Sequence, residues 1–224
     1  MHAMQVSRTG IKVQAALAVL ALACAAPVIH AQDQSTPYSE PQPGEKVLSF
    51  YSSMPQHAIA VTHSGHVGLG FFPPGIPKFT EPGIRTGLVL NLKLADSKGE
   101  VIGFASELEL FPETSPADAD DVRWSTGWAL AIGGRGMIFL EQIEHSGGLG
   151  PKVIQPTRAS GKDWEGNWLI TTTVGPLPSG RGRIVGGTGE FDDIEGSFVE
   201  IDRLTRFTVD GNMTIDIELR LFTK

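Results

Sequence analysis

The sequence contains very little cysteine. Of its 224 residues, one is a cysteine, and it stands at position 24. A single thiol cannot close a disulfide within the chain, and cysteine-rich metal sites are excluded with it. Cys24 lies inside an apolar N-terminal stretch, so a chain cleaved after that stretch would have no thiolate nucleophile.

Long apolar runs are missing beyond the N-terminus. The run Val13–Ala26 follows two basic residues, is too short for a comfortable membrane span, and is typical of a secretory signal. Ile29–Ala31 resembles a cleavage site. We therefore expect residues 1–31 to be a signal peptide and the protein to be periplasmic or secreted. The alternative is a lipoprotein anchored through Cys24, because the residues before it resemble a lipoprotein cleavage box.

Basic residues are outnumbered. Lysine and arginine total 18 against 25 aspartate and glutamate, which gives a formal net charge of −7. No basic stripe interrupts this balance, so nucleic acid and anionic membrane surfaces are not expected partners.

Sustained helical periodicity is also absent after the signal. Residues 32–45 are polar and contain three prolines, which predicts a disordered leader. Residues 46–224 instead carry short β-type segments separated by Gly- and Pro-rich turns, among them the hairpin signal Asp210-Gly211-Asn212. This pattern predicts one all-β domain, an antiparallel closed β-barrel of about eight strands, calycin-like, which is wide enough for one small ligand. The expected strands are Leu48–Ser52, Ala58–Thr62, Arg85–Ala95, Val101–Phe111, Gly127–Ile132, Met137–His145, Trp168–Val174, Arg183–Val185, Ser197–Val209 and Met213–Phe222.

A glycine-rich corner is the most specific motif. Residues Arg183–Gly196 read R-I-V-G-G-T-G-E-F-D-D-I-E-G, and they resemble the G-G-T-G-x-F-x-x-x-x-G signature of dirigent proteins and the related allene oxide cyclase barrels. Leu48–Tyr51 and Gly127–Gln142 resemble other strands of that family more weakly. The resemblance implies a secreted eight-stranded barrel with an apolar cavity, no cofactor and no metal, assembled as a homodimer or homotrimer.

The chain departs from the family at two places. Asp192 and Glu195 stand where dirigent proteins have arginine, and Ser52-Ser53 replaces the His-Asp that ends their first strand. The resemblance therefore implies the fold more strongly than the plant reaction.

Three residues are predicted to be catalytic. Glu141 and His145 share one face of their strand, where an inward carboxyl can act as general base and an imidazole as proton shuttle. Arg203 lies in register with the apolar positions of its strand and can stabilise an anion if it points inward. The alternative for all three is an outward, solvated side chain. Glu107 and Glu109 alternate with leucines and are expected on the solvated face of their strand.

Aromatic residues supply the predicted cavity wall. Trp128 and Trp168 lie in predicted strands, and Phe139 and Ile201 share the faces of the catalytic candidates, so all four are predicted to bind substrate. The spacing of the histidines matches no strong metal motif, so no metal site is expected.

The resemblance, taken together with these candidate residues, implies a cofactor-independent lyase, isomerase or cyclase. Its substrate would be a small, apolar, phenolic molecule of the lignin-type phenylpropanoid class, held in the barrel. The alternative is a non-catalytic periplasmic carrier of a hydrophobic small molecule, and a third hypothesis is a structural domain with a packed, cavity-free interior.

Overall fold

A computed structural model describes residues 37–63, 82–84, 86–113 and 121–224, without the side chains of residues 37 and 59–63. The predicted signal peptide lies outside the described residues. The strands are β1 (Lys46–Met54), β2 (Ala58–His63), β3 (Gly87–Ala95), β4 (Val101–Leu110), β5 (Arg123–Ile132), β6 (Gly136–His145), β7 (Trp164–Thr171), β8 (Thr173–Gly175), β9 (Gly182–Gly189), β10 (Gly196–Phe207) and β11 (Met213–Thr223).

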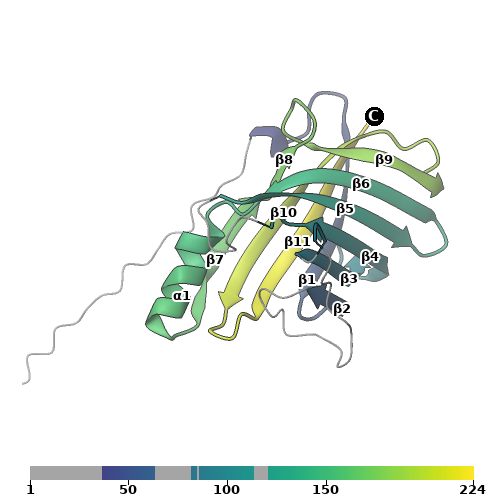
Figure 1. Cartoon of the computed structure of the whole chain (residues 1–224). Coiled ribbons are helices and arrows are strands. Elements are labelled where there is room, and N and C mark those ends of the chain that lie inside the picture. Colours follow the sequence, from purple (N-terminus) through teal and green to yellow (C-terminus); the bar gives the residue numbers. More distant parts are fainter. Residues whose placement is uncertain (1–36, 64–81, 85, 114–120) are drawn as a thin grey trace, which may run out of the picture.

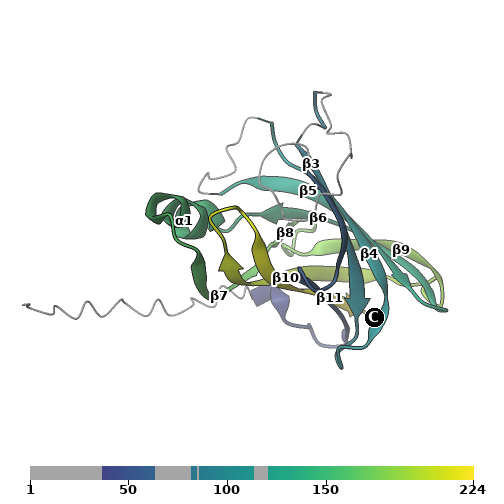
Figure 2. The same ribbon diagram turned by 90° about the horizontal axis from the view of Figure 1, so that it is seen from below.

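Eight of these strands close a ring. The order β1-β11-β10-β9-β6-β5-β4-β3 consists of antiparallel pairs, and β3 returns to β1 through the pair Tyr51 and Ala95. Outside this ring, β2 pairs with β3, β7 with β10 and β8 with β6. Two perpendicular views show the curved sheet wrapping onto itself (Figures 1 and 2). The predicted closed antiparallel barrel is confirmed.

Helical structure differs from the expectation. The sequence predicted none after the signal, but a π-helical turn, Gly150–Ile154, leads into α1, Gln155–Ser160. In both views α1 lies beside β7 (Figures 1 and 2). With six residues, α1 is too short to display a helical period in the sequence. No helix of the described residues is long and apolar enough to span a membrane.

The barrel interior is filled at one end. Side chains from all around the ring are almost fully buried there, and they form one cluster. Its fully buried members include Phe50, Leu92, Leu94, Leu130, Ile138, Phe198, Leu219 and Leu221. The packed-interior hypothesis is therefore half right, since the other end of the same barrel is hollow.

The glycine-rich corner closes the filled end. Strand β9 ends at Gly189, which has a φ of 66°, and Phe191 in the following turn is buried in the core. Strand β10 then begins at Gly196, which has a φ of 149°. Both glycines take backbone conformations that side chains disfavour, which explains the composition of the motif.

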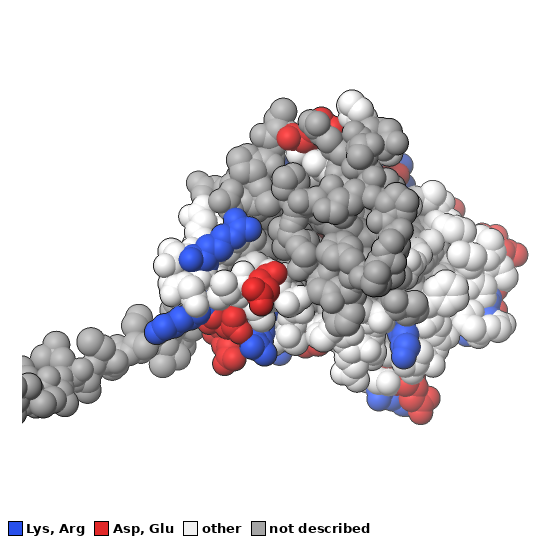
Figure 3. Space-filling view, turned by 60° about the horizontal axis from the view of Figure 1, so that its bottom comes forward, with Lys and Arg blue, Asp and Glu red and all other residues white. Residues whose placement is uncertain are grey.

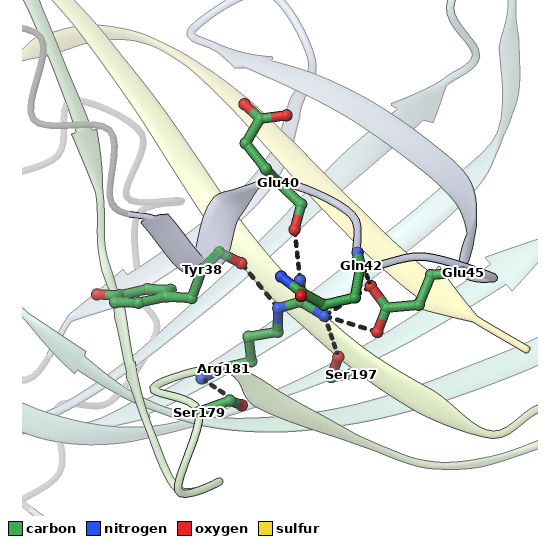
Figure 4. A network of polar contacts seen from close by, with 7 residues as sticks. All are labelled: Tyr38, Glu40, Gln42, Glu45, Ser179, Arg181 and Ser197. Atoms are coloured by element: carbon green, nitrogen blue, oxygen red, sulfur yellow. Dashed lines mark hydrogen bonds and ion pairs between the residues drawn. The ribbon is translucent and has the colours of Figure 1, made fainter.

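Residues 37–45 lie in the segment for which disorder was expected, and they pack on the outside of the barrel. Arg181, which is 3% exposed, donates hydrogen bonds to the carbonyl oxygens of Tyr38 and Glu40, to the carboxylate of Glu45 and to Ser197 (Figure 4). One buried guanidinium thus holds this segment against β9 and β10.

Candidate functional site

The hollow end of the barrel contains a cavity of about 530 Å³. Most of its wall is apolar. The lining comes from β1, β3, β4, β5, β6, β7, β10, β11 and the helical connection, and it includes Met54, Leu88, Leu90, Phe111, Trp124, Leu149, Ile154, Trp168, Ile170, Leu204, Phe207, Met213, Ile215 and Ile217. This volume suits one small organic ligand.

Five carboxyl groups meet inside this apolar wall. They belong to Glu107 and Glu109 on β4, Glu144 on β6, and Glu200 and Asp202 on β10, and all five line the cavity. Within each strand the period of two puts neighbouring acids on one face. The four glutamates are 2–9% exposed, and the Oδ1 atom of Asp202 is inaccessible to solvent.

Glu200 lies at the centre of the group. Trp128 Nε1 donates to Glu200 Oε2 at 3.0 Å, and the Gln142 side-chain amide donates to the same oxygen and to Glu144 Oε1. The amide is oriented in turn by Thr173, whose hydroxyl donates to Gln142 Oε1. Because these neutral donors converge on Glu200, this residue is the best place in the cluster for a negative charge.

Burial shifts the whole cluster toward the protonated form. Loss of solvation, and next the charge of Glu200, raise the pKa of Glu107, Glu144 and Asp202 well above the usual range. Burial also raises the pKa of Glu200, but hydrogen bonds from Glu144, Gln142, Trp128 and Asp202 oppose this effect. Glu200, on which these donors converge, is therefore the member of the group that most readily carries a negative charge, whereas Glu144 and Asp202 more readily hold a proton.

Glu109 extends the group toward β5. Burial, and next the charge of Glu200, raise its pKa to about 8, although hydrogen bonds with the side chains of Trp124 and Glu144 oppose the shift. The Trp124 indole donates to Glu109 Oε1 at 2.7 Å. Side-chain hydrogen bonds join Glu109 to Glu144, Glu144 to Glu200 and Glu200 to Asp202, so these four carboxyl groups form a continuous chain.

The same cluster has oxygen atoms that a hard divalent cation prefers. One carboxyl oxygen each of Glu107, Glu109 and Glu144 lies within 4.8 Å of the other two. However, the indole of Trp124 and the amide of Gln142 already donate to Glu109 and Glu144. These donors compete for the oxygens that a cation would need, so the acidic triad does not by itself identify a metal site.

Glu141 and Arg203, two of the predicted catalytic residues, point away from the cavity. Glu141 is half exposed and forms an ion pair with Arg183 at 3.1 Å on the outside of the barrel. Arg203 is exposed on the outer face of β10. The predicted inward orientation is wrong for both, because β6 and β10 turn the opposite face to the core.

His145 is the predicted catalytic residue that does line the cavity. It lies at the rim, where its Nδ1 is 3.1 Å from Asp121 Oδ1 and its Nε2 is 3.2 Å from the Thr171 carbonyl oxygen. Both ring nitrogens are therefore engaged with protein partners. The imidazole and the exposed Glu141 carboxylate are not brought together as an acid–base pair.

The predicted substrate-binding residues divide in two. Trp168 lines the cavity, and Trp128 is buried behind it with its indole on Glu200. Phe139 is 36% exposed on the outer face of β6, and Ile201 lies on the outer face of β10, opposite Thr171 of β7. The inward orientation predicted for these last two is wrong for the same reason of register.

The carboxyl cluster itself was missed. Glu107 and Glu109 were expected to be solvated, but the leucine between them, Leu108, is 59% exposed and the glutamates are buried. A signal was present on β6, where Gln142 and Glu144 share the face of the apolar residues 138 and 140. Polar residues on the inward, apolar face of a strand, close to the end of that strand, indicate a functional site next to the packed core.

Comparison with known proteins yields similarity of fold alone. No family model matches the chain, and no curated protein is significantly similar in sequence. Among solved structures, the chain is similar to a pterocarpan synthase dirigent protein at 14% identity and a TM-score of 0.37, over 80% of this chain and 85% of that one. That structure belongs to the family that the glycine-rich corner resembles.

Two cyclases are similar at the same low level. One is a heme-binding cyclase that catalyses a cycloaddition in neoabyssomicin biosynthesis, with 11% identity, a TM-score of 0.34 and coverage of 81% of this chain and 68% of that one. The other is a Diels Alderase from Streptomyces koyangensis, with 9% identity, a TM-score of 0.34 and coverage of 82% and 71%. At such scores the barrel is established by its own strand pairing, and the similarities carry no argument about activity.

Proposed function

We propose that the protein is a cofactor-independent isomerase, cyclase or lyase that acts on a small apolar substrate inside the barrel. The observation that carries this proposal is the chain of buried carboxyl groups at an apolar cavity, in which the Trp128 indole and the Gln142 amide both donate to Glu200. General acid–base catalysis needs both forms within reach of one substrate. The substrate class that we propose is phenolic, and the site of action is the periplasm or the exterior of the cell.

The chemistry of such a site is a proton transfer with no net change. The Glu200 carboxylate accepts a proton from one position of the substrate, and a protonated neighbour, Glu144 or Asp202, donates a proton at a second position. The bonding electrons released at the first position form the new bond or double bond of the product. The proton that Glu200 gained then moves along the carboxyl chain and restores the resting state.

Turnover of a substrate panel tests the proposal. We expect the purified protein to convert at least one member of a set of phenylpropanoid dimers and oxylipins, detected as a new mass or a new retention time. In D₂O, product should gain deuterium at the reprotonated carbon, because the carboxyl chain exchanges with solvent. We expect Glu200→Gln and Glu144→Gln to lower kcat by about 10²- to 10⁴-fold, and Glu190→Gln, on an exposed turn beside Arg135, to leave it unchanged.

Binding without conversion is the outcome that favours the alternative, a carrier of hydrophobic molecules, which the mostly apolar wall also supports. Undiminished turnover in both folded variants, Glu200→Gln and Glu144→Gln, would rule out the carboxyl chain as the catalyst. Circular dichroism of each variant shows whether it is folded.

A further inference from the structure

The chain crosses from strand β10 to strand β6 beside the acidic cluster. Strand β7 pairs with β10 and ends at Thr171, whereas β8 begins at Thr173 and pairs with β6. At the crossing, the backbone N–H of Thr172 donates to the Glu200 carbonyl oxygen. The Glu200 N–H donates to the Thr173 hydroxyl at 2.7 Å, so a side chain serves as its acceptor where the neighbouring strands part.

This hydrogen bond fixes the direction of those that follow it into the cluster. A backbone N–H can only donate, so the Thr173 oxygen accepts there and its single hydrogen is directed to Gln142 Oε1. With its oxygen held at Thr173, the Gln142 amide presents its hydrogens to Glu144 Oε1 and Glu200 Oε2. The series therefore begins at the backbone of Glu200 and ends on the carboxyl group of the same residue. All four residues are 0–3% exposed, so solvent does not compete for these bonds.

Two neutral donors converge on Glu200, because the Trp128 indole joins the Gln142 amide on Oε2. By contrast, Asp202 Oδ1, which belongs to the same cluster, has no hydrogen-bond partner among the described residues. Neutral donors stabilise a carboxylate relative to its protonated form. The place of the negative charge therefore depends on the Gln142 amide keeping its hydrogens toward the cluster.

We propose that Thr173 is a positioning residue, whose hydroxyl orients the Gln142 amide and so keeps the negative charge of the cluster on Glu200. The inference rests on the proposed function, because Glu200 is the base of that mechanism. Thr173 and Gln142 are both described residues, and neither lines the cavity. Thr173 thus acts on the base through Gln142, without contact with a substrate.

The indole groups report this charge without a substrate. The chain has four tryptophans, and each gives one indole N–H signal in the proton–nitrogen NMR spectrum. Trp128 donates to Glu200 and Trp124 to Glu109, so their signals follow two carboxyl groups separately as pH changes. The other ionisable groups among the described residues that line the cavity are Glu107, Glu113, Glu144, His145 and Asp202. We expect the Trp128 signal of the full-length protein to change at a lower pH than the Trp124 signal, because burial raises the pKa of Glu109 to about 8.

Loss of the Thr173 hydroxyl should raise the proton affinity of Glu200. We expect Gln142→Met, which removes the amide itself, to raise the midpoint of the Trp128 signal by about one to two pH units, as for a hydrogen bond to a charged group. Thr173→Val keeps the shape and should raise the midpoint by at least about half a unit. Thr173→Ser keeps the hydroxyl and should retain the wild-type midpoint. Adding Thr173→Val to Gln142→Met should cause no further shift, because Thr173 acts through the amide.

Thr171→Val is the matched control. Thr171 is 2% exposed at the end of β7, and its Oγ1 has no hydrogen-bond partner among the described residues, so this variant should keep the wild-type midpoint. The inference would be overturned by an unchanged midpoint in Thr173→Val, by an equal shift in Thr171→Val, or by a Thr173→Val shift that persists beside Gln142→Met. The dispersion of the same spectrum shows whether each variant is folded, and Thr173→Ala repeats the test if Thr173→Val is not.

The midpoints are measured without turnover, so this inference and the proposed function can fail separately. The expected shifts in a protein that converts no substrate would uphold the role of Thr173 and contradict the proposed function. Turnover in the wild type, with no shift in Thr173→Val, would contradict the role of Thr173 alone. If both proposals hold, the pH profile of kcat should move with the Trp128 midpoint in each variant.

Discussion

At the residue scale, the buried carboxyl groups make an unusual demand on the folded state. A carboxyl group with a raised pKa holds its proton in the folded chain at a pH where the unfolded chain has released it. Stability then falls as pH rises, because the folded state binds more protons. For Glu109 this interval runs from its ordinary pKa of 4.5 to about 8, and the other members of the cluster shift in the same direction.

We therefore expect the melting temperature to fall as pH is raised from 5 to 8. Glu109→Gln should flatten part of this slope, because the amide stays neutral and its oxygen can still accept from the Trp124 indole. Scanning calorimetry across this interval measures both effects, and Glu190→Gln should keep the wild-type slope. A melting temperature that rises steadily with pH would mean that the cluster is ionised in the folded protein.

Arg181 is a second buried charged group, and we expect the stability of the fold to depend on it. It is 4% exposed at the side chain, pairs with Glu45 at 2.8 Å and stacks on the Phe222 ring at 3.8 Å. We expect Arg181→Met to lower the free energy of unfolding by about 3 kcal/mol, because the carboxylate and the carbonyl oxygens of residues 38 and 40 lose their donor.

The comparison variant is Arg183→Met. Arg183 is two residues further along, half exposed, and paired with the equally exposed Glu141, so its loss should change stability by less than about 1 kcal/mol. Urea denaturation gives both values. Similar losses in the two variants would show that the clamp on residues 37–45 contributes little.

At the scale of the element, the positions of the strands could be predicted from the sequence, but the face that each strand turns toward the interior could not. The expected strands correspond to β1 through β11, with β5 beginning four residues earlier than expected and Trp168–Val174 divided between β7 and β8. The alternation of apolar and polar residues, the glycines and the turn motifs depend only on neighbouring residues, so they predict strand positions without knowledge of the tertiary structure. Which face points inward depends on the partner strands, and a shift of one residue inverts it.

Strand β10 shows why orientation was not predictable. Both of its faces are buried near its start, where Val199 is 0% exposed on the side opposite Phe198 and Glu200. Its register then shifts between Leu204 and Arg206. The buried Val199 favoured the wrong face, and the sequence carried no sign of Arg181 and residues 37–45, which cover the outer surface near Ser197. Because the wrong face of β10 was assigned to the interior, Glu200 and Asp202 were not recognised as cavity residues.

The start of β10 offers a test of element packing. A Cβ atom on Gly196 would lie 2.0 Å from the Phe222 carbonyl oxygen, and its φ of 149° disfavours any side chain. We expect Gly196→Ala to destabilise the protein by about 2 kcal/mol or more through backbone displacement. Gly127→Ala is the control, since its nearest neighbouring atom would be 3.9 Å away, and it should be neutral or slightly stabilising. Thermal melting of both variants measures the effect. Equal melting temperatures of Gly196→Ala and Gly127→Ala would contradict the predicted steric clash at Gly196.

At the scale of the whole molecule, the barrel has an apolar outside as well as an apolar inside. Phe104 and Leu108 on β4, Phe139 on β6 and Val185 on β9 are 36–59% exposed. Strand β5 lies between β4 and β6, and its outward residues at these positions are Gly127, Ala129 and Ala131. Because these residues are small, the surface between the apolar side chains is flat. Elsewhere charges of both signs are scattered in small groups, as on the face shown in Figure 3.

We propose that a second copy of the chain covers this outer face, in a homodimer or homotrimer. A contiguous exposed apolar patch is typical of an interface, and closed symmetric assemblies of identical chains are the commonest oligomers. Because Leu108 lies between Glu107 and Glu109, β4 presents the subunit contact on one face and the carboxyl cluster on the other.

Size-exclusion chromatography with light scattering tests this arrangement. We expect the wild-type protein to have the mass of a dimer or trimer and Leu108→Glu to be monomeric, because the new charge would be buried without a partner. Val209→Glu introduces the same charge at a residue that is 44% exposed beside the β10–β11 turn, and it should keep the wild-type mass. A monomeric wild type at micromolar concentration would contradict the proposed assembly, whereas a monomeric Leu108→Glu that keeps the turnover of the wild type would show that each barrel holds a complete site.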